Sequence, residues 1–286
     1  MNRTSFTARL SQVVAIATMA FLWLPLFIVV AFSFEPEAAA VNLTGFTFAW
    51  YERVWEQGGM LHAMFRSLEL GLVSAAFGTV LGALLAVGLH RYRGRGFAIL
   101  ALIVYLPIVM PDVIYGISQM VFFNYMHQFI GWPSAGLVTM GIAHISFQIP
   151  YVALVVYARL VGLDRNLIHA AADLYASPLK SIYAFWLPVL KPALVAGFLL
   201  AFTLSLDDFV ISFFTSGPGS VTLPIYIWGS IARHGVTPQT NAIASIMIGA
   251  VLLVALAQTF FRARRHGHLS SNPPPNAAVT ASEGGS

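Results

Sequence analysis

Long apolar stretches constrain this chain more than any other feature. Inside a bilayer, backbone N–H and C=O groups are satisfied only within a helix or a closed barrel, and a helix that crosses the hydrocarbon core needs about 20 mostly apolar residues. Five or six stretches reach that length, depending on how the last ones are divided, and we place six near 12–34, 64–89, 97–122, 135–160, 189–212 and 240–261. The sequence therefore predicts an all-α polytopic membrane protein with six transmembrane helices.

Composition agrees with this fold class. Hydrophobic residues make up 58% of the chain, charged residues make up 9%, and the mean hydropathy is +0.78, all outside the range of soluble domains. The chain has no cysteine, which excludes disulfides and cysteine-based metal or redox sites. Its pI near 9.5 is compatible with nucleic-acid binding, but the basic residues lie in short loops beside apolar segments, where orientation signals belong. We expect a lipid environment and no nucleic-acid partner.

The basic residues predict how the chain is oriented in the membrane. Twelve Lys and Arg residues fall on one side of the predicted spans and three fall on or near the other. The first group is Arg3, Arg9, Arg91, Arg93, Arg95, Arg159, Arg165, Lys180, Lys191, Arg262, Arg264 and Arg265, and the second is Arg53, Arg66 and Arg233. Because short cytoplasmic loops are enriched in Lys and Arg, we expect both termini in the cytoplasm.

The two ends of the chain are expected to differ in order. The first apolar stretch is longer than the roughly 7 to 15 apolar residues of a secretory signal peptide, so we interpret it as an uncleaved anchor after a cytoplasmic segment 1–11. The transmembrane domain is expected to cover 12–262 and to contain a cytoplasmic loop at 161–187. Residues 263–286 are polar and rich in Pro, Ser and Gly, which predicts a disordered cytoplasmic tail.

The loop at 161–187 has helix-boundary signals of its own. Asp164 is a candidate N-cap for a short helix that ends near Tyr175, and Ser177 followed by Pro178 is typical of a second helix start. Proline at 188 is expected to end that second helix at Leu187. Three alanines at 170–172 offer a surface that another backbone can approach closely. We interpret the loop as a docking site for a partner protein, although a simple connector is the alternative.

The same loop resembles the EAA loop of inner-membrane permeases of ABC importers. Two positions depart from that pattern, because His169 stands where the family has Glu and Tyr175 stands where it has Gly. The matching residues are Ala170, Ala171, Asp173, Leu174, Ala176, Ser177, Leu187, Pro188 and Gly197. The resemblance implies a type I importer permease fold in which the loop forms helices that couple to an ATPase. The implied ATPase-coupling residues are His169, Ala170, Ala171, Asp173, Leu174, Tyr175, Ala176 and Ser177.

The resemblance extends over most of residues 60–260. The run "SLDDFVISFFTSGPGSVTLP" at 205–224 is similar to the second permease subunit of spermidine and putrescine importers. This implies a bacterial inner-membrane location and four kinds of partner: a homologous permease subunit, two ATPase subunits, an external solute-binding protein and membrane lipid. Other amines, amino-acid-like solutes, thiamine and metal chelates remain alternative substrates, and a secondary transporter or channel remains an alternative from another class.

No feature of the sequence indicates an enzyme active site. The chain has no Gly-Lys dipeptide and hence no Walker A loop, and "GPGS" at 217–220 lacks the lysine that cradles phosphate. We interpret the Gly-Pro-Gly sequence as a turn before a short segment at 223–231. His266 and His268 have no further ligand nearby in the sequence, so we expect no metal site. ATP and magnesium are expected to be used by the partner ATPase, and this chain is expected to bind no cofactor.

Carboxylates in the spans are the candidate substrate contacts, because charges in lipid are costly and face cavities or partners. Asp112 lies 17 residues after Arg95, about 25 Å along a helix, and Asp207 lies 15 residues after Pro192, about 22 Å. Both therefore lie at a similar height in the outer half of the membrane, with Asp208 beside Asp207, and Glu69 is expected at the same height. Glu69 lies about two turns from the outer end of its span, where Arg66 can neutralise it.

Protonated amines need carboxylates for charge and aromatic faces for cation–π contacts. The candidate substrate-path residues are Asp207, Asp208, Asp112, Phe209 and Tyr115. The alternative for Asp207 or Asp208 is that the side chain caps a helix break or bonds a partner subunit. We expect His144, close to the middle of its span, to be a hydrogen-bonded packing residue, with a gate or substrate contact as the alternative.

Overall fold

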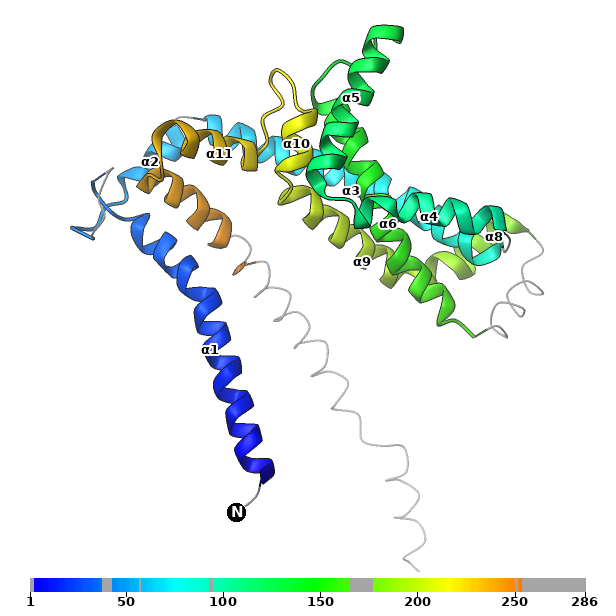
Figure 1. Cartoon of the computed structure of the whole chain (residues 1–286), viewed down its shortest axis with the longest axis horizontal. Helices are drawn as coiled ribbons and strands as arrows, with labels where there is room; N and C mark the ends of the chain where they lie inside the picture. The colour runs from blue at the N-terminus through cyan, green and yellow to red at the C-terminus, as the bar shows by residue number, and fades with distance from the viewer. Residues whose placement is uncertain are drawn as a thin grey trace, which may run out of the picture. The chain divides into compact units, whose positions relative to one another are not determined.

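The computed structural model describes residues 3–37, 43–56, 58–92, 95–164, 177–249 and 252–253, and these residues form helices without a strand. The helices are α1 (Arg3–Phe32), α2 (Ala49–Glu56), α3 (Gly59–Arg91), α4 (Arg95–Val109), α5 (Asp112–Ile130), α6 (Leu137–Val161), α8 (Pro178–Ser181), the π-helix η1 (Ile182–Trp186), α9 (Leu187–Leu206), α10 (Val210–Thr215) and α11 (Leu223–His234) (Figure 1). Residues 238–249 and 252–253 are also helical. The chain divides into two compact units, one with residues 1–57 and 234–286 and one with residues 58–233. The all-α fold class is confirmed.

Four helices in the described part of the chain are long and apolar enough to cross a membrane. They are Arg9–Phe32, Gly59–Arg91, Leu137–Val161 and Ile182–Leu206. They coincide with the first, second, fourth and fifth predicted spans. The sixth predicted span, 240–261, is helical over the residues that are described, and its remainder lies outside them.

The third predicted span is divided in two, so the prediction of one helix over 97–122 is wrong. Helix α4 ends at Val109 and α5 begins at Asp112, with Pro111 in an extended conformation at φ −59° and ψ 134°. Pro111 has no N–H to donate, and the residue before a proline resists the α conformation. Asp112 consequently stands in the first turn of a new helix.

The fifth predicted span also differs from the expected 189–212. It stops at Leu206, and α10 begins at Val210 after a short break. At its other end the helix does not stop at Leu187, as predicted, because Trp186 and Leu187 both have helical dihedrals. The π-helix η1, in which the Leu187 N–H donates to the Ile182 carbonyl, accommodates Pro188 directly after it. The predicted start at Pro178 after Ser177 is confirmed.

Helices α3, α6 and α9 pack together and form the core of the 58–233 unit (Figure 1). Small residues on α3 and α9 allow this packing, since backbones approach closely where side chains are short. A Cβ on Gly82 would lie 2.7 Å from the Val152 Cβ and 2.9 Å from the Ile149 carbonyl oxygen, and one on Gly197 would lie 3.0 Å from Val152 Cγ1. Val152 on α6 is therefore enclosed by glycines of two neighbouring helices.

In the other unit, the segment between α1 and α2 is ordered around the side chain of Glu35, which is fully buried. Its carboxylate accepts hydrogen bonds from the Thr44 hydroxyl, from the Thr44 N–H at 2.6 Å and from the Glu37 N–H at 3.3 Å. The Trp50 indole donates to the Glu35 carbonyl at 2.7 Å. The hydroxyl of Thr44 is the largest cause that lowers the pKa of Glu35, and the backbone donors of Thr44 and Glu37 add to it against burial.

We expect the order of this segment to depend on pH. A carboxyl with a lowered pKa contributes stability at neutral pH, and that contribution is lost as the pH falls through the folded-state pKa. Hydrogen exchange at the Thr44 and Thr47 amides, corrected for intrinsic rates, should therefore accelerate at acid pH. In Glu35→Gln it should already be fast at pH 7, while Glu37→Gln, which alters an exposed side chain, should behave like the unaltered chain. Equal protection in Glu35→Gln at pH 7 would contradict this role.

Candidate functional site

The two adjacent carboxylates predicted as substrate contacts lie at the break between α9 and α10. Asp207 is the C-cap of α9, with its N–H donating to the Thr203 carbonyl at 3.2 Å, and Asp208 and Phe209 complete the break. The break places two carboxylates in a short non-helical segment between apolar helices. Their side chains have different environments, because Asp207 is exposed whereas the side chain of Asp208 is 10% exposed.

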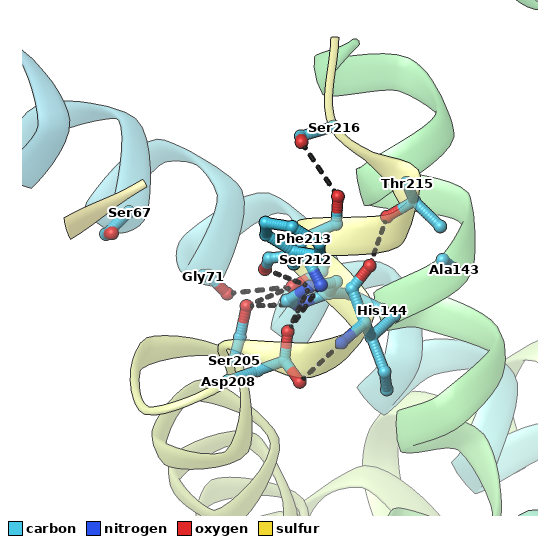
Figure 2. Close-up of polar contacts among 12 residues, drawn as sticks. Ser67, Gly71, Ala143, His144, Ser205, Asp208, Ser212, Phe213, Thr215 and Ser216 are labelled. Carbon is cyan, nitrogen blue, oxygen red and sulfur yellow. Dashed lines mark hydrogen bonds and ion pairs between the residues drawn. The ribbon is translucent and has the colours of Figure 1, made fainter. Parts of the chain in front are cut away.

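Asp208 points inward and is engaged by the protein. Its side chain is 10% exposed, Oδ1 accepts from the Ile211 N–H at 3.2 Å, and Oδ2 accepts from the Ser212 N–H at 2.7 Å. Oδ2 also lies 3.3 Å from Nε2 of His144 on α6 (Figure 2). Asp208 thus caps α10, which is the alternative that the sequence left open for this pair.

His144 contacts both helices at the break. The residue is 2% exposed, its Nδ1 lies 2.7 Å from Ser205 Oγ at the end of α9, and its Nε2 lies 3.0 Å from Ser212 Oγ on α10. The expectation of a buried, hydrogen-bonded histidine is confirmed. The ring bridges the last turn of α9 and the first turn of α10.

The hydrogen-bonded network continues from Ser205 into α3 and back to α6. Ser74 Oγ donates to Ser205 Oγ at 3.3 Å, and Gln148 Nε2 donates to Ser74 Oγ at 3.2 Å. All of these side chains are buried, and buried polar groups are costly unless they are bonded. The serines of this network were not predicted, and their signal in the sequence is a set of polar residues within apolar spans.

Asp207, in contrast, is exposed. It lies within electrostatic range of Asp208 and of Asp112, which is itself exposed at the start of α5. Of the carboxylates that helix length placed at a similar height, Asp207 and Asp112 therefore interact electrostatically, whereas Glu69 is paired with Arg66. A cluster of negative charge with two exposed members suits a ligand that carries more than one positive charge.

The two candidate aromatic residues lie in different surroundings. Phe209 is half-buried, and its ring centroid lies 5.5 Å from that of Phe213 and 5.6 Å from that of Trp228. Tyr115 is 7% exposed, and its hydroxyl is 2.8 Å from Ser146 Oγ. Phe209 is therefore placed beside the acidic break, whereas Tyr115 is part of the core.

Glu69 forms an exposed ion pair with Arg66, with 2.8 Å between Arg66 Nη1 and Glu69 Oε2. This is the neutralisation that the sequence analysis gave as the alternative to substrate contact. The part of the chain that the structure describes contains no group of three or more His, Asp or Glu side chains arranged to hold a metal ion.

Most of the predicted ATPase-coupling residues lie outside the described residues. These are His169, Ala170, Ala171, Asp173, Leu174, Tyr175 and Ala176. Ser177 is described, is exposed, and accepts a hydrogen bond at its carbonyl from the Ser181 N–H at 3.1 Å. The structure therefore describes the helical segment that leads from Ser177 to Asp207 from its first turn.

Comparison with known proteins gives matches over most of the chain. The family described as "Binding-protein-dependent transport system inner membrane component" matches residues 78–266. The putrescine transport system permease protein PotI of Escherichia coli strain K12 is 39% identical over 254 residues, 88% of this chain and 90% of that protein. The spermidine/putrescine transport system permease protein PotC of Haemophilus influenzae is 36% identical over 248 residues, 86% of this chain and 94% of that protein.

Solved structures show the same fold. A chain of a bacterial ABC transporter involved in the import of the acidic polysaccharide alginate superposes with a TM-score of 0.71 at 19% identity, over 92% of this chain and 96% of that one. A chain of an amino acid ABC transporter superposes with a TM-score of 0.54 at 16% identity, over 76% of this chain and 99% of that one. At such low identity, these likenesses concern the fold alone.

Proposed function

This chain belongs to the family of inner membrane components of binding-protein-dependent transport systems, and we propose that it is a permease subunit of an ATP-driven polyamine importer. The choice of polyamines as the substrate rests on the sequence identity, 39% and 36% over most of each chain, to permeases named for putrescine and for spermidine/putrescine. The site also favours a positively charged substrate, because the exposed carboxylates of Asp207 and Asp112 lie within electrostatic range of each other.

The proposed importer has further subunits. A homologous permease would complete the translocation path, an external binding protein would deliver the solute, and two ATPase subunits would hydrolyse ATP with magnesium. In this arrangement the chain crosses the membrane six times, has both termini in the cytoplasm, and presents the loop from His169 to Ser177 to an ATPase. The lack of a Walker A sequence supports the assignment of hydrolysis to another chain.

The chemistry of the site follows from the charge of a polyamine. Each protonated amine loses water as it enters the membrane, and carboxylates such as Asp207 and Asp112 replace that hydration with charge-assisted hydrogen bonds. The ring of Phe209, half-buried beside the break, offers a face to an ammonium group. ATP binding and hydrolysis would then move the docked loop, and the spans would open the path to alternate sides.

The test is uptake of labelled putrescine and spermidine by the complex reconstituted with its partner subunits and binding protein. We expect uptake that requires ATP and competition by unlabelled putrescine, but not by an amino acid, thiamine or a metal chelate. ATP hydrolysis stimulated by loaded binding protein, without polyamine uptake, would retain the importer and reject the substrate. Uptake that persists without ATP and collapses with the ion gradient would instead indicate a secondary transporter.

A further inference from the structure

We propose that His144 is a positioning residue for the adjacent carboxylates Asp207 and Asp208. It holds Asp208 as the cap of α10, and it thereby fixes the break between α9 and α10 from which Asp207 presents its carboxylate to an amine. The inference rests on the proposed polyamine transport and adds a residue to it. It also assigns the two neighbouring carboxylates different tasks, with Asp208 stabilising the protein and Asp207 available to the substrate.

The ring of His144 contacts the helices on both sides of the break. Ser205 lies two residues before Asp207, and Ser212 lies within α10, yet both hydroxyls lie within 3.0 Å of the His144 ring nitrogens. His144 is itself held in α6, which packs against α3 and α9. The segment 207–209 is therefore fixed at both ends to a third helix, and the backbone at Asp207 has little freedom to rotate.

The hydrogen bonds around His144 have a defined direction. The negative oxygen of Asp208 faces Nε2 of His144 at 3.3 Å, so a proton on Nε2 is favoured because two acceptors would repel each other. In the neutral ring, Nδ1 then accepts from the Ser205 hydroxyl. Ser205 in turn accepts from Ser74, and Ser74 accepts from Gln148. The Nε2 proton at the end of this series lies between two acceptors, Ser212 Oγ at 3.0 Å and Asp208 Oδ2 at 3.3 Å.

The two neighbouring carboxylates differ in how far they are available to a substrate. The carboxylate of Asp208 is engaged by the Ile211 N–H, the Ser212 N–H and the His144 ring, and its side chain is 10% exposed. Asp207 is exposed and lies within electrostatic range of Asp112. A cation that reaches the break therefore meets Asp207 first, at a position set by the neighbouring cap.

The test compares His144→Ala and His144→Gln with Met140→Ala in the reconstituted complex. Met140 is buried in α6 one turn before His144, so its truncation reports general damage to the packing of this helix. We expect His144→Ala to lower the putrescine transported per ATP hydrolysed by about tenfold, the loss expected for a hydrogen bond to a charged group. His144→Gln can still donate to Asp208 and should recover part of that loss. Met140→Ala should reduce the amount of complex but not this ratio.

A second readout does not require a transported solute. The chain has no cysteine, so Asp207→Cys introduces the single thiol of this subunit, and its rate of modification by a cationic methanethiosulfonate reports the position of residue 207. We expect that rate to change several-fold when His144→Ala is added, to return toward the starting value with His144→Gln, and to stay unchanged with Met140→Ala.

The inference is overturned if the labelling rate is the same with and without His144→Ala. It is also overturned if His144→Ala lowers transport per ATP as much in the Asp207→Asn background as in the unaltered chain, because a residue that acts through Asp207 should show little further effect there. Absence of polyamine uptake in the unaltered complex would reject the proposed function alone, and the labelling rates would still decide the role of His144.

Discussion

Asp207→Asn is expected to lower ATP-dependent putrescine uptake by about tenfold or more while ATP hydrolysis stimulated by the loaded binding protein continues. The substitution keeps the size of the side chain and removes its charge. A hydrogen bond between ionised partners is worth about 1.5–3 kcal/mol, which corresponds to a factor of ten or more. Because Asp207 is exposed, the loss should appear in transport rather than in folding.

The measurement is the amount of putrescine taken up per ATP hydrolysed in proteoliposomes. Glu69→Gln is the matched control, because it also neutralises an exposed carboxylate on a spanning helix, but one that is paired with Arg66 at 2.8 Å. We expect that variant to transport normally. Equal losses in both variants would show that uptake depends on the total negative charge of the subunit and not on a contact at Asp207.

Gly82→Val is expected to destabilise the subunit strongly, because α3 has no space for a side chain where it crosses α6. Even a Cβ at residue 82 would lie 2.7 Å from Val152 Cβ and 2.9 Å from the Ile149 carbonyl oxygen, and a backbone atom cannot move aside as a side chain can. Overpacking of a core costs about 1–3 kcal/mol, and the added methyl groups of valine increase the conflict. Helix α3 would have to separate from α6.

The thermal midpoint of the purified complex measures this effect. Gly88→Val lies on the same helix and meets no heavy atom within 4 Å at its Cβ, so it should leave the midpoint nearly unchanged. Gly82→Ala combined with Val152→Ala should recover part of the loss that Gly82→Ala causes alone, since the truncation removes Val152 Cγ1, which would lie 2.9 Å from the new Cβ. An unchanged midpoint in Gly82→Val would contradict the close packing of these helices.

Length and hydropathy located four of the six predicted spans in the described part of the chain, but they did not place every helix boundary. The helix boundaries predicted from proline were wrong at two positions. The helix continues through Pro188, where an end was predicted, and it breaks at Pro111, where a continuous helix was predicted. The difference is local. A π turn precedes Pro188 and accommodates its ring, whereas Pro111 follows a residue outside the helix and is extended. A proline in the sequence therefore does not by itself determine whether a helix continues or ends.

The acidic site was predictable in part for the same reason that the spans were. Counting residues along helices placed Asp112 and Asp207 at one height, and the structure has them within electrostatic range. The sequence could not distinguish Asp207 from Asp208, because the direction of each side chain depends on the geometry of the break. It could not find Ser74 or Ser205 either, since an isolated serine in an apolar span has no motif and acquires its partner only in the folded chain.

The unbroken helix from Pro178 to Leu206 has a mechanical consequence. It contains 29 residues across α8, η1 and α9, about 40 Å at the usual rise per residue. The segment is helical throughout and joins Ser177 at one end to Asp207 at the other, and the π turn and Pro188 are the positions within it where a helix bends most readily. A displacement of the Ser177 end would therefore move Asp207 at the other end, together with the segment 207–209 that His144 contacts on both sides.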